Sequence, residues 1–207
     1  MTSPATLALR QHISDILMSD SCQRIDFRWG PYHIDGWNYT AVGLALIGAN
    51  HSMRLSVGHM RPHDEATYDP DTNTLRLPNA NYAAPTIGTA ANPNLAFQRM
   101  IIVHECTHAA VDQMRRARQI LYRSNEVLAF VGGALFNAYE GDPYATVAGD
   151  VYDFARVVAA NIKDTPGSLI GTPADVQALE SAITQNAAYT FLKTRPHTMI
   201  RNSGLRL

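Results

Sequence analysis

Two histidines stand one helical turn apart, and a glutamate directly follows the first of them. His104, Glu105 and His108 lie in residues 100–111, an almost wholly apolar stretch that predicts a buried helix. On an α-helix, positions i and i+4 lie on one face, about 40° apart, so both imidazoles can bind one ion. Glu105 points about 100° away from His104 and can reach a water on that ion. The spacing predicts a zinc site with two histidine ligands and a glutamate general base.

Such a helix needs a third protein ligand, because a catalytic zinc ion keeps one position open for water or substrate. Glu126 is the best candidate, at the start of the next predicted helix, which runs from Ser124 to about Glu140. A short connection makes the two helices antiparallel neighbours and can return this carboxylate toward the histidines. Gly132 and Gly133 lie in that second helix. Glycines there cost helix stability, which indicates a close approach of the metal helix.

Other roles for these residues stay open. Asp112 is a rival third ligand, but it lies about 12 Å from His104 along a straight helix, which favours an outer or structural role. Glu126 could instead be a carboxylate that stabilises a helix N-terminus. The histidines themselves could fill a helical face by chance, in a packed bundle without metal.

The two motifs together resemble a known group of enzymes. The sequence HECTH at residues 104–108, followed by NEVLA at 125–129, resembles the gluzincin group of zinc metallopeptidases, which includes thermolysin-like enzymes and the M1 aminopeptidases. The resemblance implies that zinc is held by His104, His108 and Glu126. It also implies a zincin-like fold, in which an antiparallel sheet precedes the metal helix and its edge strand aligns a peptide.

The chain departs from that group in two respects. Phe130 stands where thermolysin-like enzymes carry an acidic partner for a ligand histidine, so the orienting group must come from elsewhere. No motif assigns the residue that stabilises the oxyanion. The candidates for that role are Tyr122, Tyr139, Tyr144, Tyr152 and His197.

Composition and charge are those of a globular protein with one domain, residues 1–207. Hydrophobic residues make up 46% of the chain and charged residues 17%, and the net charge of −1 gives no reason to expect nucleic acid or an anionic membrane surface as partner. No signal peptide or membrane span is recognisable, so a cytoplasmic location is the default unless a dedicated machine exports the protein. Cys22 and Cys106 do not form a disulfide framework, and nothing indicates the oligomeric state.

The pattern of the chain predicts an α+β fold, with a mostly antiparallel sheet in the N-terminal part and a helical half that carries the metal helix. The tail from Tyr189 is basic and predicts a solvated terminal segment. Strands are expected at 24–29, 37–47 and 52–58 and in a hairpin over 67–77, and helices at 4–19, from Asn92-Pro93, and over 124–140, 148–162 and 172–183.

These observations predict a zinc-dependent hydrolase, a peptidase that acts on a peptide or protein substrate. Zinc lowers the pKa of its bound water to about 7 and polarises the scissile carbonyl, and Glu105 takes the proton and passes it to the leaving amine. The alternative is a catalytically inactive or non-proteolytic zinc-binding protein that serves as a binding or regulatory module.

Overall fold

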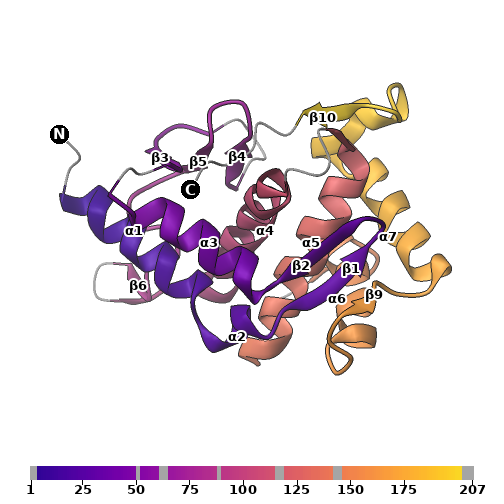
Figure 1. Cartoon of the computed structure of the whole chain (residues 1–207), viewed down its shortest axis with the longest axis horizontal. Helices are drawn as coiled ribbons and strands as arrows, with labels where there is room; N and C mark the ends of the chain where they lie inside the picture. Colours follow the sequence, from indigo (N-terminus) through magenta and orange to yellow (C-terminus); the bar gives the residue numbers. More distant parts are fainter. Residues whose placement is uncertain are drawn as a thin grey trace.

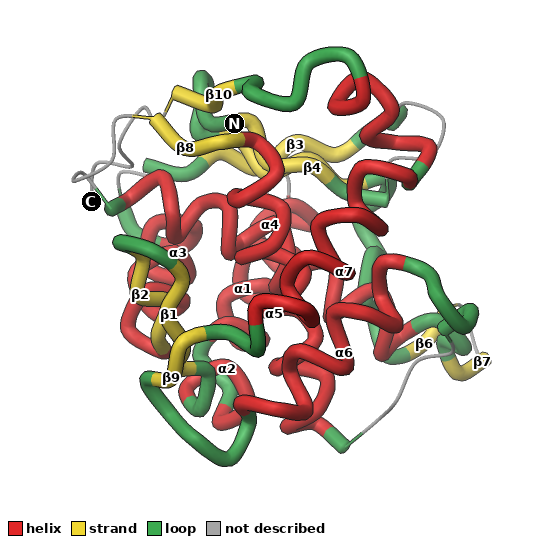
Figure 2. The backbone as a smooth tube through the Cα atoms, turned by 90° about the vertical axis from the view of Figure 1, so that its right-hand side faces the viewer, coloured by secondary structure: helices red, strands yellow, loops and turns green. Residues whose placement is uncertain are grey.

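The computed structural model describes residues 4–49, 52–60, 65–87, 90–114, 119–141 and 146–201, and these form an α+β structure. The helices occupy the centre, and four small sheets lie around them (Figure 1, Figure 2). In chain order the elements are α1 (Pro4–Leu17), α2 (Asp20–Gln23), β1 (Asp26–Trp29), β2 (Tyr32–Asp35), α3 (Gly36–Ile47), β3 (Arg54–Val57), β4 (Thr67–Asp69), β5 (Thr74–Leu77), β6 (Thr86–Ile87), β7 (Ala90–Ala91), α4 (Leu95–Gln113), β8 (Gln119–Leu121), α5 (Tyr122–Glu140), α6 (Val151–Ile162), β9 (Ser168–Leu169), α7 (Pro173–Gln185), the 3₁₀ helix η1 (Ala187–Lys193) and β10 (Met199–Arg201).

The strand predicted over residues 37–47 is wrong, because this segment is the helix α3. A capping box starts it: the Asp35 carboxylate accepts a hydrogen bond from the Asn38 backbone N–H at 3.1 Å, and the Asn38 side chain accepts from the Asp35 N–H at 2.9 Å. The helix then buries Tyr39 and Leu46, seven residues apart on one face. Capping and burial together outweigh the strand preference of its aromatic and β-branched residues.

The expectation of a mostly antiparallel sheet holds only in part: the strands form small separate sheets, and two of these contain a parallel pair. β1 pairs antiparallel with β2 and parallel with β9. In the sheet of order β3-β5-β4, β3 is parallel to β5 and β4 is antiparallel to it. The hairpin predicted over 67–77 is confirmed as β4 and β5, and its polar tip contains Asn73 at a positive φ of 49°. β4 therefore lies at one edge of its sheet.

The helix predicted to begin at Asn92 begins at Leu95 instead, so Asn92 is not the N-cap. The Asn92 side chain donates to Gln98 Oε1 and to the Ala84 carbonyl, and its Oδ1 accepts from the Asn94 N–H. The polar side chain is thus used to join the preceding loop to the first turn of α4. The helices predicted over 4–19, 124–140, 148–162 and 172–183 are confirmed, within a few residues at their ends, as α1, α5, α6 and α7.

The basic tail predicted to be solvated is exposed over residues 193–197, but the tail is structured as far as β10. Leu192 of η1 is buried, and Tyr189 packs against Tyr122 at the start of α5. β10 pairs antiparallel with β8, the strand that leads into α5. Apolar and aromatic side chains explain the difference, because their burial outweighs the basic residues between them. The segment from η1 to β10 therefore lies beside the start of α5.

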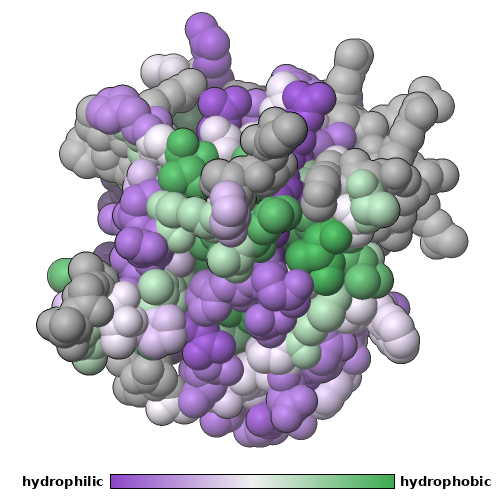
Figure 3. Space-filling view, turned by 90° about the vertical axis from the view of Figure 1, so that its left-hand side faces the viewer, coloured by the Kyte–Doolittle hydropathy of each residue, from purple (hydrophilic) through white to green (hydrophobic). Residues whose placement is uncertain are grey.

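The surface formed by α1, α3 and β3 is mixed in character. Figure 3 shows a band of apolar side chains between polar ones on this face, and Leu7 of α1 and Leu44 of α3 are exposed.

Cys22 and Cys106 are both buried and free, as expected for small apolar residues. None of the described helices is both long and apolar enough to cross a membrane.

α4 and α5 pack closely as antiparallel neighbours. Arg99 near the start of α4 forms an ion pair with Glu140 at the end of α5. Near the middle of α5, a Cβ atom added at Gly132 would lie 2.6 Å from Thr107 Oγ1, and one at Gly133 would lie 3.0 Å from Met100 Sδ. The glycine pair therefore permits the close approach of α4, as the sequence predicted.

We expect Gly132→Ala to lower the free energy of unfolding by about 1–3 kcal/mol, the usual cost of overpacking, although alanine favours a helix. The new methyl group would also lie 2.6 Å from the Tyr39 hydroxyl, which shares a buried hydrogen bond of 2.8 Å with Thr107. Urea unfolding measures the change. Gly58→Ala is the control, because no atom lies within 4 Å of the added Cβ. Equal stability of the Gly132 variant and the parent would contradict tight packing.

Candidate metal centre

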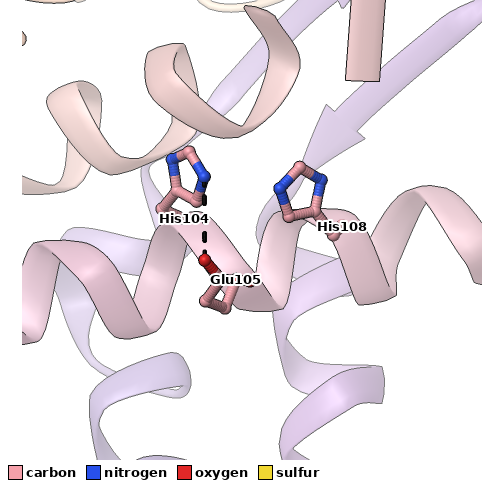
Figure 4. Close-up of side chains that lie close together, drawn as sticks. All are labelled: His104, Glu105 and His108. Carbon is pink, nitrogen blue, oxygen red and sulfur yellow. Dashed lines mark ion pairs between the residues drawn. The ribbon is translucent and has the colours of Figure 1, made fainter. Parts of the chain in front are cut away.

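α4 brings three potential metal-binding side chains together. The rings of His104 and His108 project from one face of the helix, and Glu105 leaves it beside His104 (Figure 4). One ligand atom from each of the three residues lies within 4.8 Å of the others. All three side chains are buried, with at most 9% of each residue exposed. The spacing predicted from the sequence is therefore present on an observed helix.

Glu126 of α5 faces both histidines. Its Oε2 lies 3.5 Å from His104 Nε2, and its Oε1 lies 3.6 Å from His108 Nε2. Glu126 is 4% exposed, and Oε2 has no hydrogen-bond partner among the described residues. A buried carboxylate oxygen without a donor is costly, whereas two imidazole nitrogens and a carboxylate form a common donor set for zinc. These residues therefore fit a zinc ion.

Glu105 lies to the side of this group. Its Oε1 is 3.8 Å from His104 Nε2, the pair marked by the dashed line in Figure 4. Its Oε2 accepts a hydrogen bond of 2.7 Å from the backbone N–H of Tyr68 in the edge strand β4. Glu105 thus has one oxygen held by the sheet and the other nearer His104, whereas Glu126 faces both rings.

Tyr68 contacts the metal helix a second time, and the sequence offered no signal for either contact. Its hydroxyl donates to Asp112 Oδ2 at 2.9 Å, two helical turns beyond Glu105. Asp112 is 2% exposed and anchors the β4–β5 hairpin in this way. The structure therefore gives Asp112 a structural contact, in line with the expectation of an outer role.

Phe130 stands at the position where the resemblance to thermolysin-like enzymes would place an acidic partner for one of the histidines. Its ring packs edge-to-face on His104, with the centroids 4.5 Å apart. Nδ1 of His104 and Nδ1 of His108 have no hydrogen-bond partner among the described residues. Packing against Phe130, instead of a hydrogen bond, therefore restrains the His104 ring.

Some of the candidates for oxyanion stabilisation line the cavity at the histidines, and the others do not or lie outside the described residues. Tyr139 is remote from the site and donates to the Lys163 carbonyl, Tyr144 lies outside the described residues, and His197 is not among the residues that line the cavity at the histidines. Tyr122 and Tyr152 line that cavity. So does Tyr189, which sequence analysis had assigned to a solvated tail and which interacts with Glu126.

The cavity has a volume of about 480 Å³ and is lined by both polar and aromatic side chains. Four carboxylates line it, and no lysine or arginine does so in the described parts of the chain. The residues around the histidines and Glu126 are Glu65, Ala66, Thr67, Tyr68, Pro70, Ile101, Glu105, Asp112, Tyr122, Asn125, Phe130, Tyr152, Asn186, Ala188, Tyr189, Phe191 and Ile200.

Burial and mutual contact shift the ionisation of the three central groups. Burial lowers the pKa of His108 to about 4, and the nearby Glu126 offsets only part of this effect. Burial also acts to lower the pKa of His104, but contacts with Glu126 and Glu105 outweigh it and raise that pKa. Burial acts to raise the pKa of Glu126, but the two histidines outweigh it, so its pKa is lowered. At neutral pH, Glu126 is ionised and His108 is neutral, as metal binding requires.

No protein-family model, characterised protein or solved structure matches the chain. The geometry of the site therefore carries the functional argument.

The two histidines affect the stability of the metal-free protein in opposite directions. Unfolded histidine titrates near pH 6.5. Folded His108 takes its proton only near pH 4, so the stability it contributes above pH 6.5 is lost as the pH falls toward 4. His104 has a raised pKa, so its contribution is present below pH 6.5 and is lost as the pH rises through its folded pKa.

We expect the two rings to titrate separately in the metal-free protein. At pH 6, His104 should be doubly protonated and paired with Glu126, and His108 should be neutral. Ring ¹⁵N chemical shifts followed from pH 8 to pH 4 measure this directly. Titration of both rings together near pH 6.5 would contradict the arrangement.

Proposed function

We propose that the chain is a zinc-dependent hydrolase that cleaves peptide bonds, a peptidase with a gluzincin-type site and a zincin-like fold. The observation that carries the proposal is the position of Glu126, whose two oxygens face the Nε2 atoms of His104 and His108 at 3.5 and 3.6 Å. These three residues would hold the ion. Zinc, when bound, supplies a Lewis acid that polarises the carbonyl and lowers the pKa of water to about 7.

The proximity of Glu105 to His104 supports a role as general base. The Tyr68 N–H holds its Oε2, and this contact directs the carboxylate toward the histidine face. Glu105 would accept a proton from the attacking water and then deliver it to the leaving amine. Its side chain is buried, which strengthens such charge interactions.

The edge strand β4 supports a peptide as substrate. β4 lies at the end of the sheet order β3-β5-β4, and Ala66, Thr67 and Tyr68 line the cavity. An edge strand offers backbone groups to an added extended peptide. Glu105 already accepts from the Tyr68 N–H, so a peptide aligned along β4 would use other backbone groups of this strand and would pass beside Glu105.

We expect the purified parent protein to bind about one zinc ion per chain and Glu126→Gln to bind it at least about 10–100-fold more weakly, since loss of outer partners alone has that effect. Zinc content by mass spectrometry and competition with a chelator measure the change. Glu65→Gln is the matched control, because Glu65 lines the same cavity but is exposed and not paired with either histidine. Full zinc binding by Glu126→Gln would show that Glu126 is not a ligand. Absence of stoichiometric zinc from the parent would refute the site.

We expect Glu105→Gln to retain zinc but to lose peptide hydrolysis by about 100- to 10,000-fold, the usual contribution of general acid–base catalysis. His104→Ala should lose both zinc and hydrolysis. Cleavage of a diverse peptide pool, followed by mass spectrometry with and without chelator, provides the readout. Zinc binding by the parent without any cleavage would favour the alternative of a non-proteolytic binding or regulatory module. Undiminished cleavage by Glu105→Gln would refute the assigned base.

A further inference from the structure

One wall of the cavity consists of aromatic rings contributed by two distant parts of the chain. Tyr122 begins α5, and Tyr189 and Phe191 lie in η1. Tyr122 packs edge-to-face on Phe191 with the centroids 5.0 Å apart, and its ring lies 6.1 Å from that of Tyr189. We call these three residues the ring wall.

The ring wall is continuous with the metal site. The Tyr189 ring lies 6.3 Å from that of Phe130, and Phe130 in turn lies 4.5 Å from His104. Aromatic contacts therefore extend without a break from Phe191 to a proposed zinc ligand. A group held against the ring wall would belong to the residue next to the bond under attack, or to a close neighbour.

Phe191 is more exposed than its role in packing requires. It is 37% exposed, whereas the neighbouring Leu192 is 2% exposed and joins the core. A single exposed apolar residue needs no explanation, but Phe191 lines a cavity together with Tyr122, Tyr189 and Ile200. Such a concentration of apolar surface in a concave site is typical of ligand-binding pockets.

The charges around the ring wall select against acidic groups. The carboxylates of Glu65, Glu105, Asp112 and Glu126 line the cavity, and no lysine or arginine does so among the described residues. Three of them already have partners: Glu105 with the Tyr68 N–H, Asp112 with the Tyr68 hydroxyl, and Glu126 with the histidines. An acidic side chain at the ring wall would find no basic side chain among the described lining residues, whereas an apolar one gains contact with the rings.

We propose that the ring wall is a specificity subsite, which binds a large apolar side chain of the substrate, aromatic or branched aliphatic, near the scissile bond. This inference rests on the proposed peptidase function. Burial of the Phe191 ring by that side chain supplies the selective contact, and the carboxylates reject aspartate and glutamate at the same position.

The test compares kcat/KM for peptides that differ at one position, with Phe, Leu, Ala, Arg or Glu there, using the zinc-loaded full-length protein. We expect Phe and Leu peptides to be preferred over Ala by about 10-fold or more, the discrimination usual for an apolar pocket. Phe191→Ala should reduce that ratio to near unity, and Phe191→Tyr should keep it. Trp37→Ala is the matched control, because Trp37 is an exposed ring on α3, 79% accessible, and does not line the cavity.

The ratio between substrates does not depend on how much of a variant is folded, so a purely structural role for Phe191 would leave the ratio unchanged and overturn the proposal. A preference for Arg over Phe and Leu would also overturn it, in favour of a site for cations. Binding of the same peptides to the zinc-loaded Glu105→Gln variant, measured by calorimetry, separates the two proposals. Selective binding of Phe and Leu peptides that depends on Phe191, without cleavage by the parent, would support the subsite and refute the peptidase. Cleavage by the parent without a preference for apolar side chains would support the peptidase and refute the subsite.

Discussion

The close contact between α4 and α5 determines how Glu126 lies relative to His104 and His108. A carboxylate on one helix can face two histidines on another only when the helix axes come near each other, and side chains between them normally prevent this. Gly132 and Gly133 remove that obstacle, since a Cβ at either position would press on Thr107 or Met100. The Arg99–Glu140 ion pair at the far end restrains the same pair of helices. The site is therefore a consequence of helix packing as much as of the residues that compose it.

This packing places ionisable groups in a setting that is unfavourable without an ion. His104, His108 and Glu126 are all buried, and Nδ1 of both rings and Oε2 of the carboxylate lack hydrogen-bond partners among the described residues. Buried polar atoms without partners reduce the stability of a fold. A cation bound to the folded state alone would offset this loss through mass action. The same groups that weaken the metal-free protein would thus become a source of stability in the metal-bound one.

The sequence predicts those parts of the structure that depend on the local spacing of residues. The positions of His104 and His108 on one helix, and of Glu126 at the start of the next, follow from helical periodicity and from two short motifs. The segment that became α3 was assigned to a strand because its aromatic and β-branched residues outweighed an unnoticed capping box at Asp35 and Asn38. Local patterns conflict in such a segment, and contacts with the rest of the fold decide the outcome.

Local sequence patterns did not predict the contacts between segments that are distant in the chain. The hairpin containing Tyr68 was predicted, but not that its backbone N–H would reach Glu105 and its hydroxyl Asp112. Tyr189 was placed in a solvated tail, although it lies in the cavity beside Glu126. Both residues come from outside the two central helices, one before α4 and one after α5.

Tyr68 and Tyr189 lie in segments that flank the helix pair on either side in the chain. The helix pair supplies the residues proposed to bind the ion, and the flanking segments supply the cavity around them. β4 brings backbone groups to Glu105, whereas η1 brings rings to the neighbourhood of Glu126. Changes in η1 could alter which side chain the cavity accepts without changing the spacing of the groups on α4 and α5. In the proposed peptidase, the residues of the chemistry and those of the selectivity would thus come from different segments of the chain.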